Sequence, residues 1–258
     1  MPSDPVRQPP AATPAVWVKI CGVRDLATLR EVITAGADAV GLNFYTPSPR
    51  SVTADVARAL SREGAGEIER VGLFVNHPVE WVLATARDCQ LDTVQLHGDE
   101  TVAEIAAVAR EFPIIRAFRV GPAGLGPVAD ELACLDAAGV RLRGALVDAQ
   151  VAGAYGGTGQ RAPWDVLRTG WNRIHWPPLN LAGGLTCENV AEAVAAVHPW
   201  GWTWRAGSSR ARLAKIRPGC ESSWRAPEAR AGRSVPADRG LLTRWCRRCL
   251  VERLLPAV

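Results

Sequence analysis

The sequence predicts an α/β fold, a (β/α)8 TIM barrel, and three observations lead to that class. Strand-like apolar runs alternate with helix-like segments from residue 16 to residue 201. The chain has 258 residues and is 48% hydrophobic, enough for one barrel domain of roughly 250 residues. Two strand-like runs, V-K-I-C-G and A-L-V-D-A, carry a thiol and a carboxyl group near their ends. Reactive side chains at strand ends are typical of barrel enzymes.

The predicted strands are nearly continuous runs of Val, Ile and Leu, as expected for strands buried on both faces. In chain order they are Val18–Gly22, Ala39–Phe44, Arg70–Asn76, Thr93–Gly98, Ile114–Val120, Ala145–Ala149 and Leu179–Gly183. Because crossover connections are right-handed, helices between such strands make them parallel. Their C-terminal ends then meet at one rim of the barrel.

Helix-like segments fill the intervals between these strands. In chain order they are Asp25–Ala35, Thr53–Arg62, Pro78–Asp88, Thr101–Arg110, Val128–Ala138 and Glu188–Val197. Strands that alternate with helices in this way build βαβ units, which supports the parallel barrel.

Composition restricts the class of protein and its compartment. No run of 18 apolar residues occurs, so we expect no membrane span. Residues 1–15 contain five prolines and lack the basic and apolar segments of a secretory signal, so we expect a disordered leader there. The seven cysteines are odd in number and scattered, which favours a cytoplasmic protein over one with a disulfide framework.

Charge is divided unevenly along the chain. Residues 202–258 hold 13 of the 30 basic and 4 of the 26 acidic side chains, a net charge of +9, whereas residues 1–201 carry −5. The same C-terminal segment contains four of the ten tryptophans and has no helical or strand periodicity. We therefore divide the chain into a leader at 1–15, a barrel at 16–201 and an aberrant Arg/Trp-rich tail at 202–258.

Seven motifs in order resemble the phosphoribosylanthranilate isomerases of tryptophan biosynthesis. They are V-K-I-C-G, G-A-D-A-V-G-L-N-F-Y with S-P-R, V-G-L-F-V-N, V-Q-L-H-G-D-E, L-V-D-A, Y-G-G-T-G, and L-A-G-G-L with E-N-V. Each motif is weak alone, but together, at barrel spacing from residue 18 to about residue 201, they are specific. The resemblance implies a barrel of the phosphate-binding type and an aldose-ketose isomerase.

The resemblance implies an Amadori rearrangement of N-(5-phosphoribosyl)anthranilate to 1-(2-carboxyphenylamino)-1-deoxyribulose 5-phosphate. Asp148 is the implied acid, which protonates the furanose ring oxygen, and Cys21 is the implied base, which removes the C2 proton. Such an acid must be kept protonated or recharged in each cycle, and such a base needs a nearby cation. We expect no cofactor, no metal, a small phosphorylated substrate, and a monomer or homodimer.

Three further residues are implied as substrate contacts. Arg50 follows Ser-Pro in the loop after the second strand, where its forked guanidinium can reach the anthranilate carboxylate or the reacting centre. Gln95 and His97 lie two residues apart and therefore face the same side of the fourth strand. Without the resemblance, Cys21 would be interpreted as a small buried hydrophobe, Arg50 as a surface arginine and His97 as a structural histidine.

Two glycine clusters are candidates for binding and closure. Gly183 and Gly184 follow the seventh strand, where backbone without a Cβ can approach a phosphate closely. Gly156 and Gly157 lie in the loop after the sixth strand, whose closure could exclude water from the reaction. As isolated patterns, both clusters are more often simple turns.

The sequence departs from the family pattern after Gly201. The pattern there is V-D-V-A-S-G-V-E-S, whereas this chain has W-T-W-R-A-G-S-S-R. Reread from the third base of each preceding codon, W-T-W-R-A permits V-D-V-A-S. The Asp is forced by fixed bases, and the Ala follows when Arg205 is encoded by a CGN codon. We therefore predict a one-base frame shift near codon 201, a disrupted eighth strand-helix unit, open sheet edges and half of a phosphate site.

Three alternatives stay open. The tail could be genuine and bind RNA or another polyanion through charge and stacking, although no RNA-binding motif is present. The barrel could be another phosphate-binding enzyme, such as the neighbouring synthase or a histidine-pathway sugar isomerase, which would need a strand-end lysine or paired aspartates at the position of Cys21. The chain could also be an inactive member of the family. Cys246 and Cys249 have no second pair at metal-site spacing, so they do not indicate zinc.

Overall fold

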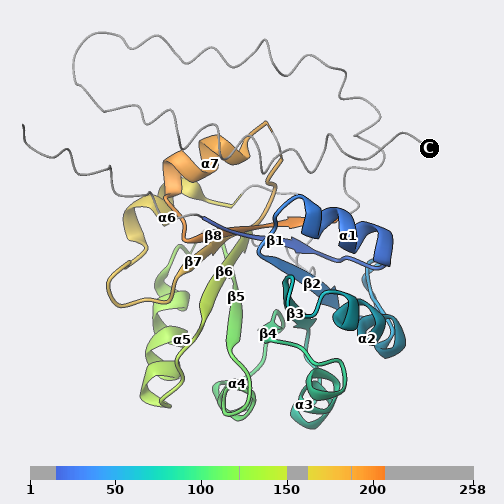
Figure 1. The fold of residues 1–258 in the computed structure, drawn as a ribbon. Helices are drawn as coiled ribbons and strands as arrows, with labels where there is room; N and C mark the ends of the chain where they lie inside the picture. The colour runs from blue at the N-terminus through green and yellow to red at the C-terminus, as the bar shows by residue number, and fades with distance from the viewer. Residues whose placement is uncertain (1–15, 122, 150–161, 187, 207–258) are drawn as a thin grey trace, which may run out of the picture.

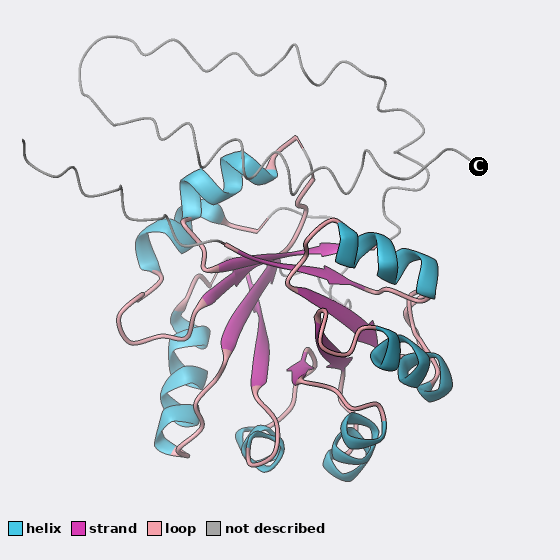
Figure 2. Ribbon diagram, viewed as in Figure 1, coloured by secondary structure: helices cyan, strands magenta, loops and turns pink. Residues whose placement is uncertain are grey.

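The computed structural model describes residues 16–121, 123–149, 162–186 and 188–206. Within them, eight parallel strands form a closed barrel in chain order, and helices surround the strands (Figure 1 and Figure 2). The predicted fold class is therefore confirmed. The leader at 1–15 and the tail beyond residue 206 lie outside the described residues.

The strands are β1 (Trp17–Cys21), β2 (Ala39–Asn43), β3 (Glu69–Phe74), β4 (Thr93–Leu96), β5 (Ile114–Val120), β6 (Gly144–Ala149), β7 (Leu179–Leu181) and β8 (Gly201–Arg205). The helices are α1 (Leu26–Thr34), α2 (Ala54–Glu63), α3 (Val79–Asp88), α4 (Val102–Ala109), α5 (Gly126–Ala137), α6 (Trp164–Gly170) and α7 (Val190–Val197). All seven predicted strands and six predicted helices are present, with small shifts at their ends. The additional helix α6 was not predicted.

Several helices begin where a side chain accepts a hydrogen bond from an otherwise unpaired backbone N–H. The carboxylate of Asp25 accepts from Thr28 N at 2.8 Å at the start of α1. Thr101 and Glu104 form a reciprocal capping box at the start of α4. These caps fix where each helix leaves the strand-end loop before it, and so they order the rim on which a barrel builds its site.

The predicted disruption of the eighth unit is not confirmed for its strand. Residues Gly201–Arg205 form β8, which pairs in parallel with β7 and with β1 and so closes the barrel. Strand pairing is made by the backbone, and Trp and Thr both suit extended structure, so W-T-W can occupy this place despite its departure from the family pattern. The described sheet therefore has no open edge. The helix expected after β8 lies outside the described residues.

Alternation along the strands divides the buried side chains into two sets. One set faces the barrel interior and includes an apolar cluster of Trp17, Ala39, Val71, Ile115, Ala117, Leu146 and Ala182. The other set faces outward against the helices and forms the larger hydrophobic core, which includes Leu42, Phe74, Leu96 and Leu167. No described helix is long and apolar enough to cross a membrane.

Candidate active site

Cys21 ends β1 at the C-terminal rim, and its thiol is half-buried and free. Its register partner on β2 is Gly41. A Cβ built at Gly41 would lie 2.9 Å from Cys21 Sγ and 3.2 Å from Lys19 Nζ. The missing side chain on β2 therefore leaves the space into which the thiol and the ammonium group both project. Proximity to a cation is what a thiol base requires.

Arg50 is brought against the residue that follows this thiol. Gly22 has φ +84°, and a Cβ there would lie 2.7 Å from Arg50 Cδ, so glycine is required both by the backbone and by the arginine stem. The loop that carries Arg50 is held in turn by Ser48, whose Oγ accepts from Asn43 Nδ2 at 3.0 Å and from Arg50 N at 3.2 Å. The guanidinium thus enters the rim beside β1.

His97 and Gln95 form a buried pair on the fourth strand and the position just past it. Gln95 Nε2 donates to His97 Nδ1 at 2.9 Å, and this contact assigns the ring proton to Nε2. Burial, followed by the charges of Lys19, Arg119 and Arg116, lowers the pKa of His97 to about 3. The imidazole is therefore neutral at physiological pH. Its Nε2 is buried and has no hydrogen-bond partner in the described part of the chain.

Asp148 lies near the C-terminal end of β6 and is buried. Its register partner on β5 is Arg119, whose guanidinium also pairs with Asp99 in the loop after β4. The carboxyl group of Asp148 thus lies at the same rim as the Cys21 thiol, as the parallel strands require. The rim carries positive charge on the Asp148 side as well as on the Cys21 side.

The loop after β7 has a geometry that only glycine adopts readily. Gly183 and Gly184 have φ +77° and +61°, in the left-handed region. Asn189 at the start of α7 holds this loop, because its Nδ2 donates to Gly184 O at 2.9 Å and its Oδ1 accepts from Thr186 N at 2.8 Å. The loop therefore joins the strand end to a helix N-terminus. Gly156 and Gly157 lie outside the described residues.

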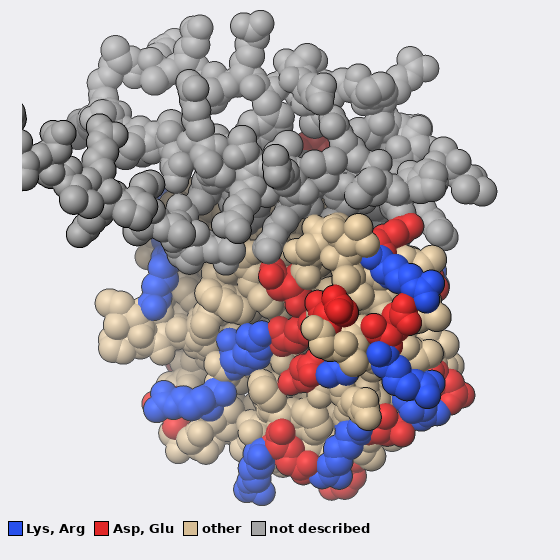
Figure 3. Space-filling model, viewed as in Figure 1, with Lys and Arg blue, Asp and Glu red and all other residues tan. Residues whose placement is uncertain are grey.

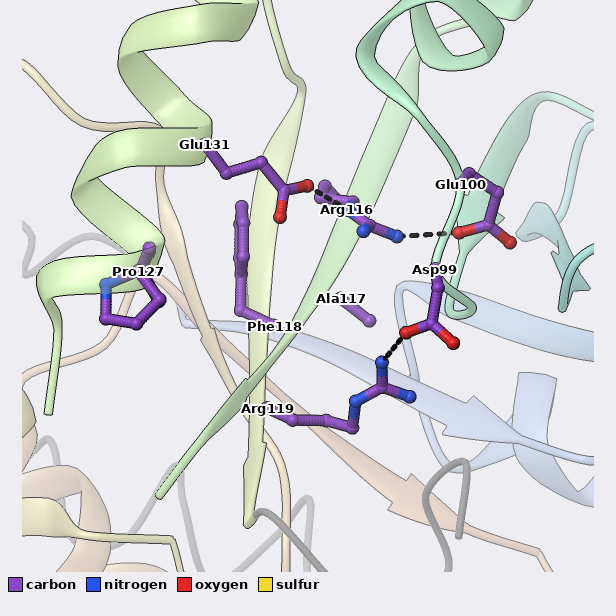
Figure 4. Close-up of a pocket in the computed structure, with 9 residues that line it drawn as sticks. Asp99, Glu100, Arg116, Ala117, Phe118, Arg119, Pro127 and Glu131 are labelled. Atoms are coloured by element: carbon purple, nitrogen blue, oxygen red, sulfur yellow. Dashed lines mark hydrogen bonds and ion pairs between the residues drawn. The ribbon is translucent and has the colours of Figure 1, made fainter. Parts of the chain in front are cut away.

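A cavity of about 340 Å³ opens between β5, α5 and the loop after β4 (Figure 4). Its charged groups are paired with one another: Arg116 lies between Glu100 and Glu131, and Arg119 points toward Asp99. None of the predicted site residues lines it. Because both of its guanidinium groups are engaged by carboxylates, we assign this cavity to the support of the rim rather than to the reaction.

Three cations of the site were missed by the sequence analysis. Lys19 is fully buried two residues before Cys21, Arg119 is the register partner of Asp148, and Arg205 is the register partner of Cys21. Alternation could have found Lys19, since residues two apart on a strand face the same side. Among the described residues, no cluster of three or more His, Cys, Asp or Glu side chains could hold a metal ion.

Known proteins that resemble this chain in sequence share one family description. A family model described as N-(5'phosphoribosyl)anthranilate (PRA) isomerase matches residues 18–204. The N-(5'-phosphoribosyl)anthranilate isomerase of Geobacter metallireducens is 40% identical over 186 residues, which covers 72% of this chain and 85% of the relative. That of Geobacter sulfurreducens is 42% identical over 186 residues, with the same coverage of 72% and 85%.

Solved structures agree with the family match. The crystal structure of phosphoribosyl anthranilate isomerase from Thermotoga maritima has a TM-score of 0.64 at 32% identity, over 75% of this chain and 89% of that one. A phosphoribosyl anthranilate isomerase in complex with reduced 1-(o-carboxyphenylamino)-1-deoxyribulose 5-phosphate has a TM-score of 0.62 at 30% identity, over 75% and 88%. The chain therefore belongs to the N-(5'-phosphoribosyl)anthranilate isomerase family.

Proposed function

We propose that this chain catalyses the isomerisation of N-(5'-phosphoribosyl)anthranilate in tryptophan biosynthesis by general acid-base catalysis. The observation that carries the proposal is a thiol and a carboxyl group at one barrel rim. Cys21 ends β1 beside Arg50, and Asp148 lies near the end of β6. A phosphorylated product analogue bound to a relative supports the same class of substrate. The family model matches residues 18–204, which include all eight strands of the barrel except the ends of β1 and β8.

In the proposed reaction, Asp148 acts as the general acid. It donates a proton to the furanose ring oxygen, the bond between that oxygen and C1 breaks, and the anilino nitrogen becomes an iminium nitrogen. Asp148 is buried, and its register partner on β5 is the cation Arg119. A general acid in this position must both give and regain its proton in each cycle.

Cys21 then acts as the base and removes the C2 proton, which gives an enolamine that tautomerises to the ketone. Lys19 Nζ projects into the same space as the Cys21 thiol, so a cation lies beside the proposed base. Neutral His97, with its proton on Nε2, is a hydrogen-bond donor for the substrate, and Gln95 orients it. Arg50 supplies a forked donor for the anthranilate carboxylate.

Phosphate binding is proposed for the loop after β7. Backbone N–H groups near Gly183 and Gly184, together with the start of α7, are suited to an oxyanion. From the family resemblance, we assign substrate contacts to Gly156 and Gly157. The reaction needs no cofactor, since both steps are proton transfers. The isomerase from Thermotoga maritima is described both as a dimer and as monomers generated from it, and we propose a monomer or homodimer for this chain.

The test is a turnover assay of the purified full chain with N-(5'-phosphoribosyl)anthranilate. Cys21→Ser and Asp148→Asn should each lower kcat by at least about 10²-fold, as expected for loss of a general base or acid. Cys134→Ser, at an exposed free cysteine, is the matched control and should leave kcat unchanged. Near-wild-type turnover in either variant would withdraw the role assigned to that residue.

Turnover and RNA-binding assays of the same protein test the three alternatives. Turnover of the substrates of the neighbouring synthase or of the histidine-pathway sugar isomerase would reassign the barrel, and no turnover of any substrate would favour an inactive member. Binding of RNA by the full chain would favour the polyanion alternative. On the described part of the face shown in Figure 3, acidic and basic side chains are interspersed rather than segregated. This face of the barrel therefore has no basic patch of the kind that binds a polyanion.

A further inference from the structure

Arg50 lies at the corner of a tight turn in the loop after β2. Ser51 N donates to Ser48 O at 3.0 Å, which closes the four-residue turn S-P-R-S. Serine at the first position and proline at the second are residues that such a turn favours, and the Ser48 hydroxyl accepts from Arg50 N two residues on. The turn is therefore encoded locally. A local turn determines the shape of the loop, but not its orientation on the barrel rim.

The orientation of the loop depends on Asn43, the last residue of β2. The Asn43 side chain is buried, its Oδ1 accepts from Tyr45 N at 2.8 Å, and its Nδ2 donates to Ser48 Oγ at 3.0 Å. Its backbone carbonyl accepts from Val52 N at 2.8 Å, where the chain returns to Asn43 in an isolated bridge with Ser51. One residue thus holds the beginning, the middle and the end of the loop.

The loop places the Arg50 stem against the residue that follows Cys21. A Cβ at Gly22 would lie 2.7 Å from Arg50 Cδ and 3.1 Å from Arg50 Cβ, so the stem packs directly on the β1 end. A misplacement of about 1 Å is enough to impair a contact that orients a substrate. On the outer side of the loop, Arg24 Nη1 donates to Pro49 O at 2.9 Å. That bond is exposed, and because water competes for it, it constrains the loop less than the buried Asn43 does.

We propose that Asn43 is a positioning residue for substrate binding: through Ser48 and the turn that follows, it determines where the Arg50 guanidinium lies beside Cys21. The proposal rests on the substrate contact proposed above for Arg50. A carboxamide suits this task because it carries both an acceptor, which Tyr45 N needs, and a donor, which reaches Ser48 Oγ. A leucine has nearly the same shape and supplies neither.

The test is steady-state kinetics of full-chain variants with N-(5'-phosphoribosyl)anthranilate. Asn43→Leu should raise KM about tenfold while kcat changes by less than about threefold, because the lost contact is to a group that does not react. Ser48→Ala should act in the same direction, and Ser48→Thr, which keeps the hydroxyl, should keep KM near that of the present chain. Thr46→Ala, at an exposed residue of the same loop, is the matched control and should change neither constant.

The decisive comparison replaces Arg50 itself. In an Arg50→Ala background, Asn43→Leu should have almost no further effect on KM, since a positioning residue acts through the group that it places. An equal rise in KM in both backgrounds would overturn the proposal, because Asn43 would then act independently of Arg50. A KM for Asn43→Leu equal to that of the present chain would overturn it as well.

Hydrogen exchange of the loop separates this inference from the proposed reaction. The N–H groups of Tyr45 and Arg50 should exchange faster in Asn43→Leu than in the present chain, because the loop loses its buried anchor. Absence of turnover in the present chain withdraws the proposed function, whereas unchanged exchange in Asn43→Leu overturns the role of Asn43 whether or not the chain is active. If Asn43→Leu fails to fold, Ser48→Ala, at a half-buried residue, carries the same comparisons.

Discussion

The imidazole of His97 is kept neutral by its surroundings, and this has a measurable consequence for stability. Its pKa falls from an ordinary value of 6.5 to about 3 on folding, first through burial and then through Lys19, Arg119 and Arg116. Between those two values the unfolded chain binds a proton that the folded chain does not. Unfolding is therefore favoured as the pH falls, and the stability linked to His97 is fully present only above about pH 6.5.

We predict that His97→Asn makes the stability of the protein less sensitive to acid. Lowering the pH from 8 to 5 should cost the present chain about 2 kcal/mol more of its free energy of unfolding than it costs the variant. The measurement is urea unfolding at both pH values. His175→Asn, at an exposed histidine, is the control. Identical pH dependence in the His97→Asn variant and the present chain would contradict the low pKa.

Two residue-scale features explain how far the site could be predicted from sequence. Cys21, Asp148 and His97 lie at or near the C-terminal ends of predicted strands. Because parallel strands of a barrel end at one rim, the sequence was enough to place these residues together. Lys19 stands within an apolar strand, where a lysine is rare, and nothing in its neighbours along the chain shows what faces it. Alternation places it on the same face of β1 as Cys21, and only the fold shows that Nζ projects into the same space as that thiol.

At the scale of elements, one buried arginine ties β5 to the structures beside it. Arg116 Nη1 donates to Glu100 Oε2 at 2.7 Å and to Gly98 O at 3.2 Å, and Arg116 Nε donates to Glu131 Oε1 at 2.6 Å. Glu100 in turn accepts from Asn76 N at 2.9 Å, so the network reaches the end of β3. Strand β5, helix α5 and the loops after β3 and β4 are thus held together by one guanidinium.

We predict that Arg116→Met lowers the free energy of unfolding by about 3–5 kcal/mol, because it leaves Glu100 buried without its partner charge. Guanidinium chloride unfolding of the variant provides the measurement. Arg141→Met removes an arginine whose pair with Asp136 is exposed, and its unfolding midpoint should match that of the present chain. A midpoint for Arg116→Met equal to that of the control would show that the network is dispensable.

The elements also show where sequence patterns were sufficient and where they were not. Continuous Val, Ile and Leu runs located seven strands, since each is buried on both faces. Helix α6 was missed because its seven residues, W-D-V-L-R-T-G, are too short to show a clear helical period. Strand β8 was predicted to be disrupted because its side chains depart from the family pattern, whereas its formation depends on backbone pairing with β1 and β7.

At the scale of the whole molecule, the main prediction is a one-base frame shift near codon 201. Sequencing the source gene across codons 195–230 should reveal one base more or fewer near codon 201. The frame-corrected protein should have a higher kcat/KM than the present chain, because it regains the second half of the phosphate site. An unchanged frame in the source DNA would instead make the 202–258 tail a genuine part of the protein.

Closure of the barrel by β8 also determines how long an apolar strand edge stays exposed during synthesis. Strand β1 pairs with β2 as soon as both have been synthesised, but its other edge stays unpaired until Gly201–Arg205 leaves the ribosome. At typical synthesis rates, roughly 180 residues correspond to about 10–40 s of exposure for an apolar edge. A segment that departs from the family pattern is therefore also the one that covers the last apolar edge of the barrel.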